Sequence, residues 1–181
     1  MKGSFLGDRV LTAANTLTLL RLLATPVVIL LLLAEMEIAA ATVFVLAAAT
    51  DFLDGRIARR RGGPSPLGTI LDPLADRLML SSVAVVLAIR DFLPSSIVAI
   101  LVGRDVLSLL GSLVFQGKIR VNKVGKAATA ILMASVAVVI YRPGVLGEVM
   151  FYSGLGLSLV AGTLYIRAMK RFFTKNTGGL R

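Results

Sequence analysis

Six long apolar stretches follow one another along the chain, and short polar segments separate them. The stretches lie at residues 15–34, 38–58, 69–89, 94–115, 124–141 and 146–168. A helix needs about 20 residues to cross the hydrocarbon core of a bilayer. Because each stretch is near that length, the pattern predicts an all-α integral membrane protein with six transmembrane helices.

The segments between the stretches are rich in charged residues, glycine and proline, as expected for loops. No internal repeat is visible, so we expect residues 1–181 to form a single membrane domain. Residues 4–14 mix apolar and charged side chains, which favours a short N-terminal interfacial helix. A solvated tail is the alternative interpretation of that segment.

Composition agrees with a membrane protein and narrows the chemistry. Hydrophobic residues make up 56% of the chain, which is high for a soluble domain. The chain has no cysteine and no histidine. Disulfides, thiolate metal sites and a histidine nucleophile are therefore excluded. Any acid–base chemistry has to come from carboxylates, lysine or tyrosine.

The chain has a net charge of +10, and the uneven distribution of its basic residues predicts how it is oriented. One side of the predicted helices collects Lys2, Arg9, Arg59, Arg60, Arg61, Lys118, Arg120, Lys123, Lys126, Lys170, Arg171, Lys175 and Arg181. The other side has only Arg90 and Arg142. By the positive-inside rule, both termini and the loop after residue 58 lie in the cytoplasm. We expect a protein of the cell inner or plasma membrane, with lipids rather than nucleic acid as partners.

Four aspartates mark the candidate site. Asp51 and Asp54 are three residues apart, and Asp72 and Asp76 are four apart, so each pair shares a helix face. The loop between the pairs is short, so we expect the second and third helices to be antiparallel neighbours with all four carboxylates at one depth. Such a cluster would hold two divalent cations, which prefer hard oxygen ligands.

Small residues and an arginine accompany the aspartates. Gly55 and Ala58 follow them on the second helix, and Gly68 opens the third. They leave a bare strip where a flat base or a diphosphate could approach the backbone, with Arg59 as a phosphate donor at its edge. The alternative is a helix-packing face of small residues, which explains the glycines but not four aspartates in register.

The complete stretch reads Asp51-x-x-Asp54-Gly55-x-x-Ala58-Arg59, then eight residues, then Gly68-x-x-x-Asp72-x-x-x-Asp76. It resembles the signature of the CDP-alcohol phosphatidyltransferases at every position. Asn15, Thr18 and Arg21 on the first stretch match as well. The resemblance implies transfer of a phosphatidyl group from CDP-diacylglycerol to an alcohol, with CMP leaving. It also implies a dinuclear Mg²⁺ or Mn²⁺ site and a homodimer.

The resemblance assigns roles to the matching residues. It implies that Asp51, Asp54 and Asp72 are metal ligands and that Asp76 is both ligand and general base. It implies a nucleotide site at Gly55, Ala58, Arg59 and Gly68, with Asn15 and Thr18 as further candidates. A threonine on a transmembrane helix, however, is often bonded only to its own backbone.

The acceptor site is predicted from basic residues. Arg104 and Lys126, each taken to lie near a helix end, would bind the phosphate of the acceptor, together with Arg120. For Arg104 the alternative is a local ion pair with Asp105. For Lys126 and Arg120 it is the positive-inside bias alone.

Two acceptors fit the local sequences. Asp72-Pro73-Leu74-Ala75-Asp76-Arg77 looks like the branch that uses glycerol 3-phosphate. Gly103-Arg104-Asp105-Val106 looks more like the cardiolipin synthases that use CDP-diacylglycerol and phosphatidylglycerol. Phosphatidylglycerophosphate synthesis is the first prediction and cardiolipin synthesis the second, and inositol phosphate fits less well. A cation transporter and a non-catalytic lipid-binding scaffold are the competing classes.

Overall fold

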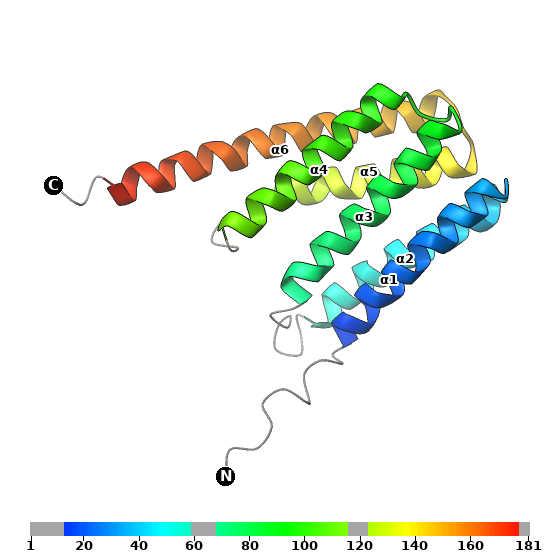
Figure 1. Ribbon diagram of the computed structural model, residues 1–181, viewed down its shortest axis with the longest axis horizontal. Coiled ribbons are helices and arrows are strands. Elements are labelled where there is room, and N and C mark those ends of the chain that lie inside the picture. The colour runs from blue at the N-terminus through cyan, green and yellow to red at the C-terminus, as the bar shows by residue number, and fades with distance from the viewer. Residues whose placement is uncertain (1–12, 59–67, 116–122, 178–181) are drawn as a thin grey trace, which may run out of the picture. The chain divides into compact units, whose positions relative to one another are not determined.

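All described elements of the chain are helices (Figure 1). The structure is a computed structural model that describes residues 13–58, 68–115 and 123–177, and the side chains of 18–50, 74–110 and 124–164. The helices are α1 (Ala13–Leu33), α2 (Glu37–Ala58), α3 (Gly68–Ile89), α4 (Ser95–Phe115), α5 (Lys123–Tyr141) and α6 (Val145–Thr177). The expected N-terminal interfacial helix lies largely outside the described residues.

The six apolar stretches predicted the six helices to within two residues at every boundary but one. The exception is the end of α6, which continues to Thr177, beyond the expected end at 168. Its apolar window ends at Leu164, and the residues after it are more polar but contain no glycine or proline before Gly178. Hydropathy therefore predicted where the apolar part ends, whereas helix propensity sets where the helix ends.

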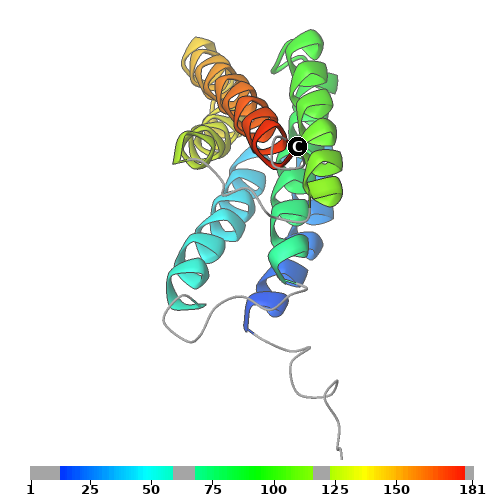
Figure 2. The same cartoon turned by 90° about the vertical axis from the view of Figure 1, so that its left-hand side faces the viewer.

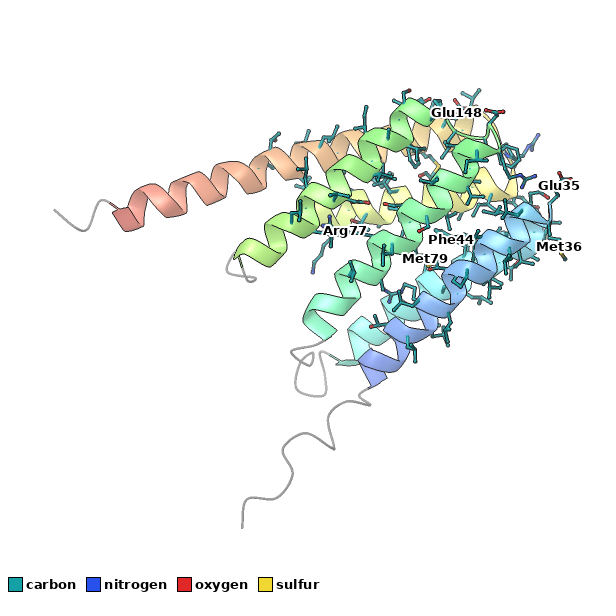
Figure 3. The ribbon with its side chains drawn as sticks, viewed as in Figure 1. Glu35, Met36, Phe44, Arg77, Met79 and Glu148 are labelled. Carbon is teal, nitrogen blue, oxygen red and sulfur yellow. The ribbon has the colours of Figure 1, made fainter. Side chains whose placement is uncertain are left out.

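The turn after α1 ends that helix with an unusual residue. The amide of Met36 donates to the carbonyl of Leu31 at 2.9 Å, and the amide of Glu35 donates to that of Leu32 at 3.1 Å. This pair of bonds is the Schellman motif, which usually places glycine where Glu35 has a φ of 58°. Figure 3 labels Glu35 and Met36 at this end of α1.

Contacts within the chain form two compact units, Met1–Arg90 and Asp91–Arg181. In the first unit, α1 packs against both α2 and α3. The expectation that α2 and α3 are direct neighbours is wrong for the described residues, where no Cα atoms of the two helices lie within 8 Å. Their ribbons are separate in Figure 2. The short loop fixes only the sequence distance between them, and α1 supplies the surface on which both pack.

The packing face of α1 is more polar than its exposed face. Its buried residues are spaced by three and four positions and comprise Thr18, Arg21, Thr25, Val28 and Leu32. Its exposed residues include Leu19, Leu20, Leu22, Leu23, Val27, Leu30 and Leu33. A helix in water would show the reverse pattern. Polar residues that face other helices while leucines face outward are typical of a helix surrounded by lipid.

Length and composition alone identify fewer spans than we expected. Among the described residues, Val124–Tyr141 and Val145–Leu164 are long and apolar enough to cross a membrane. Thr18–Leu33 and Glu37–Thr50 are apolar but shorter. The prediction of an all-helical protein is confirmed, and these segments indicate a membrane protein. Six spans and a single domain over 1–181 stay predictions.

In the second unit, α5 and α6 pack closely because α6 presents glycines to α5. A Cβ atom added at Gly154 would lie 3.0 Å from Leu132 Cγ and 3.1 Å from the Leu132 backbone nitrogen. Leu132 is fully buried, so it has no space into which to move. At Gly156, two positions further along α6, an added Cβ would meet nothing within 4 Å.

We predict that Gly154→Ala destabilises the protein and Gly156→Ala does not. Overpacking at Gly154 should cost about 1–3 kcal/mol. Alanine at Gly156 should instead add about 0.8–1 kcal/mol of helix propensity. Thermal unfolding followed by circular dichroism at the helical band would compare the two variants. Equal midpoints for both would show that α5 and α6 do not depend on this close contact.

Candidate active site

The backbone places the four aspartates at the ends of two helices. Asp51 and Asp54 lie in the last turns of α2, and Asp72 and Asp76 lie in the first turns of α3. Among the four, only Asp76 has a described side chain, so the predicted cluster stays a prediction.

Asp76 is bound by an arginine from another helix. Nη1 of Arg21 on α1 donates a hydrogen bond to Oδ1 of Asp76 on α3 and forms an ion pair with it. The Arg21 side chain is 2% exposed and that of Asp76 is 24% exposed. A buried charge is costly unless it is paired. The pair therefore links α1 to α3 at the end of α3 where the aspartates lie.

The spacing of polar residues on α1 explains how Arg21 reaches this position. Thr18, Arg21 and Thr25 share the buried face, one helical turn apart. The hydroxyl of Thr25 donates to the backbone carbonyl of Arg21 at 2.9 Å. Because the Thr25 hydroxyl is bonded to its own helix, it is satisfied on the packing face. Arg21 is therefore the residue on this face that needs a charged partner.

A second ion pair lies at the opposite end of α3. Nη2 of Arg90 donates to Oε1 of Glu37, the first residue of α2, at 2.7 Å. This hydrogen bond lowers the pKa of Glu37, which lies outside the apolar stretch at 38–58. The ion pair therefore stabilises the fold at pH values above the pKa that Glu37 has in the unfolded chain. That stabilisation is lost as the pH falls through the lower pKa that Glu37 has in the folded protein. Among the described residues, an ion pair therefore lies toward each end of α3.

A divalent metal fits the residues that the backbone brings to this region. The donors are carboxylates on helix turns, and hard cations prefer such oxygens. The structure also shows that the Asp76 carboxylate attracts a cation, because Arg21 binds it. Asp51, Asp54, Asp72 and Asp76 are the residues that would hold the metal.

Those predicted nucleotide residues that the structure describes lie at the same helix ends as the aspartates or at the start of α1. Gly55 and Ala58 belong to the last turn of α2, and Gly68 is the first residue of α3. Asn15 lies in the first turn of α1, and Thr18 is buried one turn later. Arg59 lies outside the described residues, as does Arg120 of the predicted acceptor site.

The structure corrects the placement of Arg104. It lies near the middle of α4 rather than near a helix end, because the apolar run of α4 continues on both sides of it. Its Nη1 donates to Oδ1 of Asp105 at 2.5 Å, and Asp105 is buried. The local ion pair weighed as an alternative is therefore present. Lys126 lies in the first turn of α5 and is exposed.

The partner of Asp76 is what the sequence interpretation missed. In the sequence Arg21 matches the family pattern, but nothing there pairs it with Asp76. A signal existed, because an arginine inside an apolar helix needs an acidic partner at the same depth. Several acidic residues qualified, and the sequence alone does not choose among them.

The region that contains these residues matches a known protein family. The family model described as CDP-alcohol phosphatidyltransferase matches residues 11–160. The chain belongs to the CDP-alcohol phosphatidyltransferase family. The matched region includes the ends of α2 and α3 and also Arg21. The predicted family is confirmed, and the chain is a phosphatidyltransferase of phospholipid synthesis.

Individual relatives carry two different names. A CMP-forming cardiolipin synthase of Streptomyces coelicolor is 35% identical over 91% of this chain and 85% of its own length. A CDP-diacylglycerol–glycerol-3-phosphate 3-phosphatidyltransferase of Rickettsia typhi is 28% identical over 88% of this chain and 97% of its own length. A cardiolipin synthase and mitochondrial hydrolase fusion protein of Schizosaccharomyces pombe is 39% identical over 56% of this chain, but only 17% of that protein is covered.

Proposed function

We propose that the protein transfers the phosphatidyl group of CDP-diacylglycerol to the hydroxyl of glycerol 3-phosphate and releases CMP. The family match over residues 11–160 carries this proposal. The relative from Rickettsia typhi, which is matched over 97% of its length, is named for this reaction. Cardiolipin synthesis, with phosphatidylglycerol as acceptor, is the second candidate, since the relative named for it has the higher identity of 35%.

The reaction needs a base and charge neutralisation at phosphorus. The acceptor oxygen forms a bond to the phosphorus that carries the diacylglycerol, and the bond from that phosphorus to the CMP oxygen breaks. The hydroxyl proton passes to Asp76 in this proposal. The chain has no histidine, so a carboxylate is the reasonable base. A covalent histidine intermediate is excluded because the chain has no histidine, and direct displacement is the mechanism we propose.

The remaining residues bind and orient the substrates. Two divalent ions, Mg²⁺ or Mn²⁺, would supply neutralisation of the diphosphate charge. Asp51, Asp54 and Asp72 hold them with Asp76. Gly55, Ala58, Arg59 and Gly68 receive the cytidine diphosphate, with Asn15 and Thr18 beside them. Lys126 and Arg120 attract the phosphate of the acceptor, and Arg104 joins them if the acceptor phosphate displaces Asp105.

We further propose that all six helices span the membrane, that both termini face the cytoplasm and that the enzyme is a homodimer. The outward-facing leucines of α1 support a lipid surrounding, and the distribution of basic residues supports the orientation. Family resemblance supports the dimer and the location in the inner or plasma membrane.

The decisive prediction concerns the acceptor. With CDP-diacylglycerol as donor, CMP release should require glycerol 3-phosphate, should stop on chelation and should return with Mg²⁺ or Mn²⁺. Asp76→Asn should lower kcat by ~10²–10⁴-fold, the usual value of general base catalysis. A preference for phosphatidylglycerol would make the protein a cardiolipin synthase. Absence of CMP release with any acceptor would contradict the enzyme assignment altogether.

A second prediction separates the structural role of Arg104 from a role in acceptor binding. Arg104→Gln alone removes the Arg104 side of the ion pair with the buried Asp105 carboxylate, so lost activity would be ambiguous. Removing both charges of a buried pair often leaves stability nearly unchanged. Arg104→Gln combined with Asp105→Asn should therefore keep the wild-type thermal midpoint and raise the acceptor KM. Asp105→Asn alone is the matched control. An unchanged KM in the double variant would limit Arg104 to the ion pair.

A third prediction tests orientation. The chain has no cysteine, so a single cysteine can be introduced at Lys2, Lys175 or Arg142 without further changes. Membrane-impermeant thiol reagents should label the first two only from the cytoplasmic side and the third only from outside. Labelling of Lys2→Cys in intact cells would reverse the proposed topology.

A further inference from the structure

Arg21 is a fixed cation beside a residue that the proposed function assigns to metal binding. It is buried on α1, and its guanidinium binds the Asp76 carboxylate. The Arg21 side chain is 2% exposed and the Asp76 side chain is only partly exposed, so both charges are poorly solvated. Each therefore depends on a cation or an anion supplied by the protein or by a ligand.

We propose that Arg21 is the resident counter-cation of Asp76, and that a divalent ion has to compete with it for this carboxylate. The inference rests on the proposed role of Asp76 as a metal ligand. Arg21 acts here as a positioning residue, since it acts through Asp76 and not on the substrate.

The net charge of the four aspartates and Arg21 shows what this competition means for metal binding. Asp51, Asp54, Asp72 and Asp76 carry four negative charges, and Arg21 cancels one of them. One divalent ion leaves one net negative charge, and a second leaves one net positive charge. Binding of the second ion is therefore opposed by Arg21 until a negatively charged ligand arrives. The diphosphate of the donor lipid is such a ligand, so Arg21 couples complete metal loading to donor binding.

The alternative is that Arg21 only joins α1 to α3. The other ion pair of the same unit provides a matched comparison. Arg90 binds Glu37 at the opposite end of α3, and the 14 residues from Asp76 to Arg90 correspond to roughly 21 Å along a helix. One pair joins α3 to α1 and the other joins the residue after α3 to α2, but only the first contains a proposed metal ligand. A purely structural role predicts the same behaviour for both.

The experiment measures metal binding without turnover. Full-length protein in detergent is titrated with Mn²⁺ in the absence of nucleotide, and unbound Mn²⁺ is quantified by electron paramagnetic resonance. Thermal midpoints are recorded by circular dichroism with and without Mn²⁺. The variants are Arg21→Gln and Arg90→Gln, each of which replaces an arginine by a neutral amide.

Arg21→Gln should bind Mn²⁺ about tenfold more tightly than the wild type, because a nearby positive charge is removed from a poorly solvated site. Its midpoint should fall in metal-free buffer, and Mn²⁺ should restore most of the loss. Arg90→Gln should also lower the midpoint, but by the same amount with and without Mn²⁺, and its affinity for Mn²⁺ should equal that of the wild type.

Unchanged or weaker Mn²⁺ binding by Arg21→Gln would overturn the inference. If that variant does not fold, Arg21→Met replaces it, since methionine has a long unbranched side chain without a charge. Arg21→Met should also bind Mn²⁺ more tightly than the wild type, and equal or weaker binding would again overturn the inference. Failure of the wild type to bind Mn²⁺, or equal binding by Asp76→Asn, would instead contradict the proposed metal site itself.

Discussion

The buried charge on α1 constrains everything else in the first unit. Arg21 lies on a helix whose outer surface is leucine and valine, so its guanidinium has to find an anion within the bundle. Asp76 on α3 is that anion. The pair fixes which face of α3 meets α1, and it places the amino end of α3 beside the first turns of α1. The predicted nucleotide residues Asn15 and Thr18 lie in those turns.

The reversed polarity of α1 also explains why a site for charged substrates can exist among apolar helices. Thr18, Arg21 and Thr25 form the polar part of the packing face, and Val28 and Leu32 continue it as an apolar part. The polar part lies toward the amino end of α1, where the aspartates of α2 and α3 are also found. The apolar part lies toward the carboxyl end of α1, where it packs against α2 and α3. The buried face of α1 thus has two parts. The polar part borders the region proposed for ionic chemistry, and the apolar part contributes to packing alone.

Much of the fold could be predicted because hydropathy reports it directly. The apolar stretches gave the helix boundaries, and only the end of α6 was misplaced, since a helix can continue after its apolar part ends. Neighbour relations were harder to predict. The short loop between Asp54 and Asp72 suggested that α2 and α3 touch, yet both pack on α1 instead. Loop length limits the distance between two helices but does not exclude a third helix beside both.

In the candidate site, too, some features follow from the spacing of residues along the chain and others from the packing of helices. Spacing placed the four aspartates on helix turns, and all four positions lie within α2 and α3. The choice of Asp76 by Arg21 required the packing of α1 against α3, which no local pattern encodes.

That choice bears on the chemistry of Asp76, which the proposed function asks to accept a proton and to bind metal. A carboxylate held by a guanidinium is a weaker metal ligand than one that is not, because the ion pair has to open first. The two demands are compatible if Arg21 holds the carboxylate in the resting enzyme and gives way when the donor diphosphate brings its own charge. A resting site with one carboxylate occupied by the protein's own cation would also bind stray divalent ions less tightly. The arginine would then make full assembly of the site depend on the substrate that needs it.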